Sequence, residues 1–357
     1  MKHTRPLAFL LCLLFVPALR AGDVKQTYPP PAEVRAAFLK LLDRPRVEMD
    51  VKNHSTTVKD GMEMIQESFA SEKKANGTVE RVPVLLVRPV GVKTRLPAVI
   101  VLHGTGGNKE SQLAFMKELV NRGIIGVAID ARYHGARSGG AKKAEAYNAA
   151  IVRAWKTKPG EKHEYPFYYD TCWDLWRTVD YLLKRDDIDL QRIGMIGFSM
   201  GGIQTWLASA ADERVKVVVP AIGVQSFRWS LENDKWQGRA RSINAAHQAA
   251  AKDLGEPEVN QKVCRVLWSK IIPGILDQFD CPSMLRLMAP RALLIPNGEK
   301  DANCPIEGAR LAFASAEKAY KDAGASDHLR IMVANVGHTV TPEQRQAALA
   351  WFEKWLK

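Results

Sequence analysis

The stretch Arg192-Ile-Gly-Met-Ile-Gly-Phe-Ser-Met-Gly-Gly202 decides the fold. Its first half is apolar and is typical of a buried strand, and a helical pattern over 203–211 begins directly after it. Between the two lies G-x-S-x-G, a sharp turn that holds a serine hydroxyl above the edge of a sheet. A side chain at Gly197 or Gly201 would clash within such a turn, and the following helix points its positive end at the site. The pattern therefore predicts Ser199 as a nucleophile.

Apolar runs alternate with helical segments on both sides of this turn. Strands are expected at 97–102, 124–129, 192–198, 215–220, 292–295 and 329–334, and helices at 111–122, 171–185, 203–211 and 347–356. Apolar strands separated by helices predict an α/β class with a mostly parallel sheet and helices on both faces. Extended stretches at 62–70 and 80–88, joined by an Asn76-Gly77 turn, would form an antiparallel N-terminal edge. Thr171 and Asp174 can form a capping box at one helix.

Two long segments interrupt the alternation. Residues 136–170 are rich in aromatic side chains, and residues 225–290 contain three tryptophans and helical patterns. Segments of such length in a compact domain are usually lids, and ligands bind beyond the carboxyl ends of parallel strands, so we place both there. An extension of the core is the alternative. The expected organisation is an N-terminal helix and first edge strand within 22–79, followed by one domain at 80–357.

The N-terminus, residues 1–21, has the features of a secretory signal peptide. Lys2 and Arg5 precede an apolar run, and small residues follow it up to Ala21. The run is too short to span a bilayer, so we expect cleavage near Ala21 and no stable membrane anchor. The protein would then be exported to the periplasm or the extracellular space. A buried N-terminal helix is the alternative.

Composition excludes several classes of function. The net charge is +12, of which the signal segment holds three positive charges, and no run of Lys and Arg reaches the density that nucleic-acid binding requires, so no nucleic-acid partner is expected. No metal-ligand spacing, dinucleotide fingerprint or phosphate loop is evident, so neither a cofactor nor a metal is expected. Disulfides and buried free thiols both remain open for the four cysteines beyond the signal, which are Cys172, Cys264, Cys281 and Cys304.

A serine hydroxyl is a weak nucleophile and needs a neighbouring base. The loop after the next-to-last strand contains Asp301, and the loop after the last strand contains His338, in the chain order Ser, acid, His that such sites follow. His338 would accept the proton of Ser199, and Asp301 would orient the imidazole. Other acids that could take the place of Asp301 are Glu299, Asp277 and Asp280.

A third requirement is a pair of N–H groups for the oxyanion. The glycine-rich loop 103–107 follows the first central strand. Enzymes with a nucleophilic serine in a G-x-S-x-G turn donate one backbone N–H from this position. We expect Thr105, with Gly106 as the alternative, to supply one donor and Met200 the other. His103 is expected to be a structural hydrogen-bonding residue.

The motif Asp-Ala-Arg-Tyr-His-Gly at 130–135 ends the next strand and lies on the same rim. Arg132 and Tyr133 can contact a substrate or brace the loop, and both roles stay open. Packing or surface positions are expected for His134, His247 and His328.

The elements HGTGG, DARYHGARSGG, WDLWRTVDYL, RIGMIGFSMGG, NGEKD and VGH together resemble the α/β-hydrolase superfamily, over about residues 80–357. The similar branch is the dienelactone hydrolase and acetyl xylan esterase-like group, which is related to the prolyl oligopeptidases. The resemblance implies an α/β-hydrolase fold with lid insertions and a carboxylic-ester hydrolase that acts on small-molecule or carbohydrate esters.

Two departures from these families favour an esterase. Prolyl peptidases carry a β-propeller before the hydrolase domain, for which the segment before residue 80 is too short. Dienelactone hydrolases proper use a cysteine nucleophile, where this chain has Ser199. A serine peptidase or amidase is the alternative, and a binding protein on a hydrolase fold is a third reading.

Overall fold

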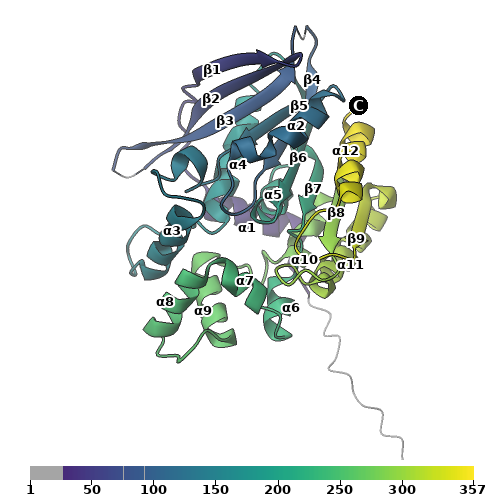
Figure 1. Cartoon of the computed structure of the whole chain (residues 1–357). Coiled ribbons are helices and arrows are strands. Elements are labelled where there is room, and N and C mark those ends of the chain that lie inside the picture. The colour runs from purple at the N-terminus through teal and green to yellow at the C-terminus, as the bar shows by residue number, and fades with distance from the viewer. Residues whose placement is uncertain (1–26, 75, 92) are drawn as a thin grey trace, which may run out of the picture.

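A computed structural model describes residues 27–357 except residues 75 and 92, so the expected signal segment lies outside the described residues. One nine-stranded sheet organises the molecule, in the order β1-β2-β3-β5-β4-β6-β7-β8-β9 (Figure 1). The strands are β1 (Lys52–Lys59), β2 (Met62–Lys73), β3 (Val79–Pro89), β4 (Leu96–Leu102), β5 (Ile125–Ile129), β6 (Ile188–Phe198), β7 (Val215–Ala221), β8 (Ala292–Gly298) and β9 (Leu329–Ala334). The first three pairs in this order, β1-β2, β2-β3 and β3-β5, are antiparallel. All remaining pairs, from β5-β4 to β8-β9, are parallel. The predicted mostly parallel sheet with an antiparallel N-terminal edge is confirmed.

The antiparallel edge has one strand more than expected. Every position of β1 is exposed, because its sequence KNHSTTVK is polar and has no apolar face to alternate with. β1 forms by pairing with β2, which the local pattern does not reveal. The hairpin expected at Asn76-Gly77 is present between β2 and β3, and Gly77 has a φ of +84°, which glycine adopts without strain.

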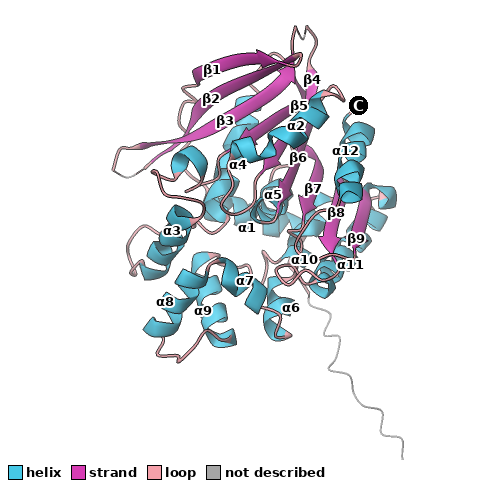
Figure 2. Ribbon diagram, viewed as in Figure 1, coloured by secondary structure: helices cyan, strands magenta, loops and turns pink. Residues whose placement is uncertain are grey.

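Helices cover both faces of the sheet (Figure 2). One face is covered by α2 (Leu113–Val120) and α12 (Pro342–Leu356), and the other by α1 (Pro31–Leu42), α4 (Tyr169–Leu182), α5 (Met200–Ala211) and α11 (Ile306–Asp322). Val99 and Ile100 are consecutive residues of β4 that pack into opposite clusters, and both are fully buried. The central strands are apolar throughout because both of their faces are covered.

The start of α4 corrects one expectation. α4 begins at Tyr169, so Thr171 and Asp174 lie inside the helix and form no capping box. The Thr171 hydroxyl oxygen instead accepts the backbone N–H of Arg132 at 3.3 Å, and the Asp174 carboxylate accepts guanidinium N–H groups of Arg132 and Arg137. Two buried cations bind the carboxylate more strongly than a backbone N–H would.

The two long segments supply the remaining helices. They are α3 (Glu145–Lys156), α6 (Phe227–Glu232), α7 (Gln237–Ser242), α8 (Asn244–Asp253), α9 (Gln261–Ile271) and α10 (Cys281–Met284), with short 3-10 turns η1 (Lys109–Gln112), η2 (Gly135–Arg137), η3 (Leu285–Met288) and η4 (Ser326–His328) completing the chain. α3 packs on α8 and α9, and these helices lie with α6 and α7 beyond the ends of the central strands (Figure 1). α10 instead packs on α5 and α11, so this end of 225–290 extends the core.

The spacing of the cysteines left open whether they form disulfides or remain free thiols. Cys172, Cys264, Cys281 and Cys304 are all buried free thiols. No helix in the described part of the chain combines the length and the apolar character needed to cross a membrane.

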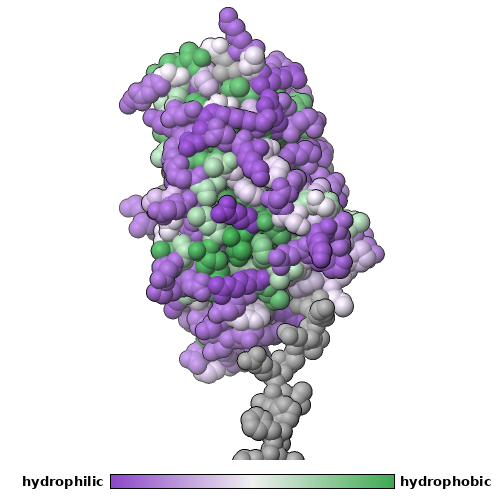
Figure 3. Space-filling view, turned by 90° about the vertical axis from the view of Figure 1, so that its right-hand side faces the viewer, coloured by the Kyte–Doolittle hydropathy of each residue, from purple (hydrophilic) through white to green (hydrophobic). Residues whose placement is uncertain are grey.

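The face of the molecule in Figure 3 is mostly hydrophilic, with a hydrophobic area near its middle. Near β8 and β9, exposed apolar side chains include Leu311 on α11 and Val333 on β9. β9 is the edge strand at this end of the sheet, and the exposed Arg330 lies among its apolar residues, a placement that discourages pairing with other strands.

Candidate active site

Ser199 lies at the turn between β6 and α5 in a strained conformation. Its φ of +57° is one that a residue with a side chain rarely adopts, and such strain is concentrated at functional sites. A Cβ at Gly197 would lie 2.2 Å from the carbonyl oxygen of Gly201, and a Cβ at Gly201 would lie 2.7 Å from that of His103. Both glycines are therefore required by close backbone contacts, as the motif predicts. The Ser199 N–H donates to Ala221 O at 3.0 Å, which ties the turn to the end of β7.

Three separate loops bring Ser199, His338 and Asp301 together. Nε2 of His338 lies 2.7 Å from Oγ of Ser199, and its Nδ1 lies 2.7 Å from Oδ2 of Asp301. The Asp301 side chain is fully buried, whereas the His338 side chain is 25% exposed. With the proton on Nδ1, the imidazole donates to the carboxylate and its Nε2 can accept the serine proton. This geometry suits general-base activation of a hydroxyl.

The acid and the imidazole are held by neighbouring backbone. Oδ1 of Asp301 accepts the N–H groups of Asn303 at 2.8 Å and Cys304 at 3.0 Å, which leaves Oδ2 for the imidazole. The two loops also touch directly, because Lys300 N–H donates to Val336 O at 2.9 Å. The orientation of the carboxylate therefore depends on the turn at residues 301–304.

The glycine-rich loop after β4 lies against the serine turn. A Cβ at Gly104 would lie 3.4 Å from Phe198 O and 3.6 Å from Ser199 Cβ. The next residue, Thr105, is exposed, and Met200 is the first residue of α5. Among the described residues, neither of these two backbone N–H groups donates to an acceptor of the protein.

The alternative acids lie elsewhere. Glu299 forms an exposed ion pair with Arg310, and Asp277 lies 3.7 Å from Arg228 on the surface. Asp280 is buried, caps α10 and accepts the N–H of Phe227, and burial raises its pKa to about 6. None of the three hydrogen-bonds to His338 in the described structure.

The remaining motif histidines have packing roles. His103 is buried, and its Nε2 accepts the N–H of Ala131 at 3.2 Å, so it links the loops after β4 and β5 as expected. Burial lowers the pKa of His103 and lowers that of His134 to about 4, which keeps both rings neutral near pH 7. His247 is buried and accepts the indole N–H of Trp268 at 3.0 Å. His328 packs on Trp355 at the surface.

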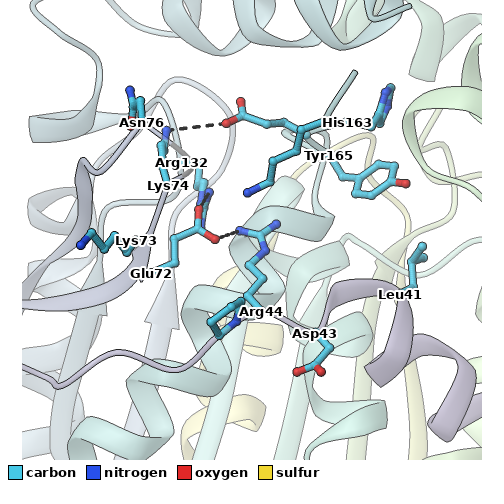
Figure 4. Close-up of a pocket in the computed structure, with 13 residues that line it drawn as sticks. Leu41, Asp43, Arg44, Glu72, Lys73, Lys74, Asn76, Arg132, His163 and Tyr165 are labelled. Carbon is cyan, nitrogen blue, oxygen red and sulfur yellow. Dashed lines mark hydrogen bonds and ion pairs between the residues drawn. The ribbon is translucent and has the colours of Figure 1, made fainter. Parts of the chain in front are cut away.

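The open question about Arg132 is answered by its partners. Arg132 is buried and donates to Glu72 at 2.8 Å and to Asp174 at 2.9 Å, so it braces the loop. Glu72 also binds Arg44, and these residues line one side of a cavity of about 500 Å³ (Figure 4). Most charges around this cavity are paired with one another. The Tyr133 hydroxyl donates to Glu164 at 2.7 Å, which is again an internal contact.

One group of side chains has the donor atoms of a metal site. Ligand atoms of Asp301, Cys304 and His338 lie within 4.8 Å of one another. Metal binding requires a thiolate, yet burial raises the pKa of Cys304 to about 12, and the Arg239 guanidinium lies 3.4 Å from its sulfur. A cation would be repelled there, so these residues suit proton transfer better than metal binding.

Comparison with known proteins agrees with this architecture. Residues 82–253 match the model of the dienelactone hydrolase family. YtaP of Bacillus subtilis (strain 168), assigned by its name to the hydrolases, is 26% identical over 290 residues, which cover 78% of this chain and 84% of YtaP.

Two solved structures share the fold. Acetyl xylan esterase 1 from Thermoanaerobacterium sp. JW/SL YS485 is 19% identical, with a TM-score of 0.64 over 92% of this chain and 95% of that one. A glucuronoyl esterase from Solibacter usitatus is 16% identical, with a TM-score of 0.61 over 90% and 91% of the two chains. The chain is therefore a carboxylesterase-type hydrolase with the α/β-hydrolase fold, and it resembles the dienelactone hydrolase and acetyl xylan esterase-like branch.

Proposed function

We propose that the protein is an exported serine carboxylic-ester hydrolase that acts through Ser199, His338 and Asp301. The observation that carries the proposal is the continuous line of contacts from Ser199 Oγ to His338 Nε2 and from His338 Nδ1 to Asp301 Oδ2, each 2.7 Å long. In this line a buried carboxylate fixes the imidazole so that its free nitrogen faces the hydroxyl.

The reaction follows from these contacts. Ser199 Oγ attacks the acyl carbon of the ester while His338 Nε2 takes its proton. The carbonyl oxygen becomes negative and is bound by the N–H groups of Thr105 and Met200. The imidazolium then protonates the departing alcohol, leaving an acyl-enzyme. Water, deprotonated by His338, attacks the acyl carbon and releases the acid and Ser199.

A carbohydrate ester with a small acyl group is the substrate class that we propose. Solved neighbours of the same fold are named as an acetyl xylan esterase and a glucuronoyl esterase, and both names refer to esters of sugars. A panel of acetylated xylan and a methyl glucuronate ester discriminates between these two possibilities. Release of acetate with no release of methanol supports the acetyl esterase.

The decisive experiment compares a nitrophenyl acetate with peptide anilides, using wild-type protein and the S199A variant. Ester turnover that is lost in S199A, with no anilide turnover, supports the proposal. Anilide turnover at a comparable rate points to the peptidase alternative. Absence of both activities, with no labelling of Ser199 by a fluorophosphonate, contradicts the hydrolase mechanism.

Export is the second part of the proposal. It depends on the signal-like segment 1–21, which is outside the described residues, and on its charged start, apolar run and small residues. The mature protein would begin near Gly22.

A further inference from the structure

Arg239 lies in α7, within the second of the two long segments (residues 225–290, here called the second insertion). It is buried, with 4% of its surface exposed. It has no carboxylate within ion-pair distance among the described residues, which is unusual for a buried guanidinium. Its Nη1 donates to the Tyr168 hydroxyl at 3.1 Å, and its Cζ lies over the ring of Phe227, 5.7 Å from the ring centre. The burial of this charge must therefore be compensated by the other contacts of the Arg239 side chain.

Those other contacts are made with the turn that holds the acid of the active site. Nη2 of Arg239 donates to Asn303 O at 2.9 Å and to Cys304 Sγ at 3.4 Å. These two residues are the ones whose N–H groups bind Oδ1 of Asp301. One guanidinium thus binds both residues that orient the carboxylate.

The second insertion touches the same turn in two more ways. A Cβ at Gly238 would lie 2.0 Å from Ala302 O, so the backbone of α7 rests directly on the turn. Once the amide oxygen and nitrogen of Gln225 are exchanged, the oxygen accepts from Nε of Arg239 at 3.2 Å and the nitrogen donates to Asn303 O at 2.9 Å. Contact between α7 and residues 301–304 is therefore close and specific.

Cys304 connects this contact to the nucleophile. Its thiol donates to Ile222 O at 3.2 Å, and Ile222 follows Ala221, whose carbonyl accepts the Ser199 N–H at 3.0 Å. Ile222 has a φ of +43°, a strained conformation that needs support from its surroundings. The turn at 301–304 thus lies between α7 on one side and the serine turn on the other.

We propose that Arg239 is a positioning residue for the ester hydrolysis, and that the second insertion is part of the catalytic machinery rather than a removable cover. Arg239 holds the 301–304 turn so that Oδ2 of Asp301 faces His338. This inference rests on the proposed function. Loss of Arg239 should misplace Asp301 without changing the surface that meets the substrate.

The test compares R239M and R239K with wild-type protein in kcat and KM on a nitrophenyl acetate. R241M is the matched control, because Arg241 lies on the same helix but is exposed. For R239M we expect kcat to fall about 100-fold, as for a displacement near 1 Å, with KM within about threefold. A loss confined to kcat is the result that a misplaced carboxylate produces, because the surface that meets the substrate is unchanged.

R239K tests the contacts that need a guanidinium group. It keeps the charge but lacks the planar group whose N–H donors reach Asn303 and Cys304, so we expect kcat to fall about tenfold with KM within about threefold of wild type. R239M with the kcat of R241M overturns the inference. If circular dichroism shows that R239M is unfolded, R239K decides: a wild-type kcat contradicts the inference, and a reduced kcat with an unchanged KM supports it. A wild-type protein without ester turnover or fluorophosphonate labelling is a failure of the proposed function instead.

Discussion

His338 Nε2 and Ser199 Oγ lie 2.7 Å apart although 139 residues separate them in the chain. They meet because β6 and β9 run parallel in one sheet, with β7 and β8 between them, so the loops after these strands emerge at the same edge. Asp301 lies in the loop after β8, and its Oδ2 contacts the other imidazole nitrogen of His338, Nδ1. The topology of the sheet thus creates the site, and each member can be tested separately.

S199A should lower turnover by about 10⁴–10⁶-fold with little change in folding, because it removes the attacking oxygen and leaves the turn intact. Ester hydrolysis under saturating substrate measures the effect. S209A is the control, since Ser209 lies buried on the same helix, away from the line of contacts. Survival of most of the activity in S199A would show that another group is the nucleophile.

D301N should lower kcat by about 10⁴-fold, because an amide cannot hold the imidazole in the tautomer that accepts the serine proton. E299Q tests the alternative acid two residues away, whose carboxylate binds Arg310 at the surface. We expect E299Q to keep wild-type kcat. The reverse order of effects in steady-state kinetics would assign the role to Glu299.

G197A should destabilise the protein severely, because the new Cβ would lie 2.2 Å from the carbonyl of Gly201. Overpacking of this kind costs about 1–3 kcal/mol or more in the free energy of unfolding, measured by urea titration. G160A is the comparison: its Cβ meets open space, so its left-handed backbone alone costs about 1–2 kcal/mol. Equal losses for the two variants would mean that the tight turn tolerates a side chain.

The buried network around Asp174 should make stability depend on pH. Burial opposes ionisation, but Arg132 and Arg137 hold the pKa of Asp174 well below its usual range. A lowered carboxyl pKa contributes stability that is fully present above the unfolded pKa of about 4 and is lost as the pH falls from there through the lowered folded pKa. Breaking such a pair costs about 3–5 kcal/mol, so D174N should be far less stable than wild type at pH 7. Urea unfolding at pH 3 should show a smaller difference, and a difference independent of pH would contradict the account.

Expression of the full chain in a host that exports proteins should yield a mature protein starting near Gly22, measured by intact mass. Cleavage there removes three positive charges and no negative ones. L13R interrupts the apolar run and should leave the uncleaved precursor inside the cell, because the run is what inserts into the export channel. Recovery of uncleaved wild-type chain outside or inside the cell would contradict the signal assignment.

Local patterns were sufficient for much of the fold, and they singled out the three side chains that lie together at the candidate site. The apolar strands and the G-x-S-x-G turn predicted the parallel sheet and the place of Ser199, because strand burial and tight turns leave direct marks on composition. The polar strand β1 has no such apolar pattern, since an exposed edge strand is held by backbone pairing with a neighbouring strand and not by burial of its side chains. Its formation depends on hydrogen bonds to β2 that no window of sequence contains.

The choice of partners for charged and polar groups required the folded chain. Thr171 and Asp174 had the spacing of a helix cap, yet in the fold Asp174 binds two arginines from another loop. Arg239 carried no signal in the sequence, and only its burial against Asn303 and Cys304 revealed a link between the second insertion and Asp301. Backbone conformation follows largely from neighbours in the chain, and was therefore readable from the residues. Electrostatic and hydrogen-bond partners are selected by distance in space, which the order of residues does not give until the sheet has brought its loops together.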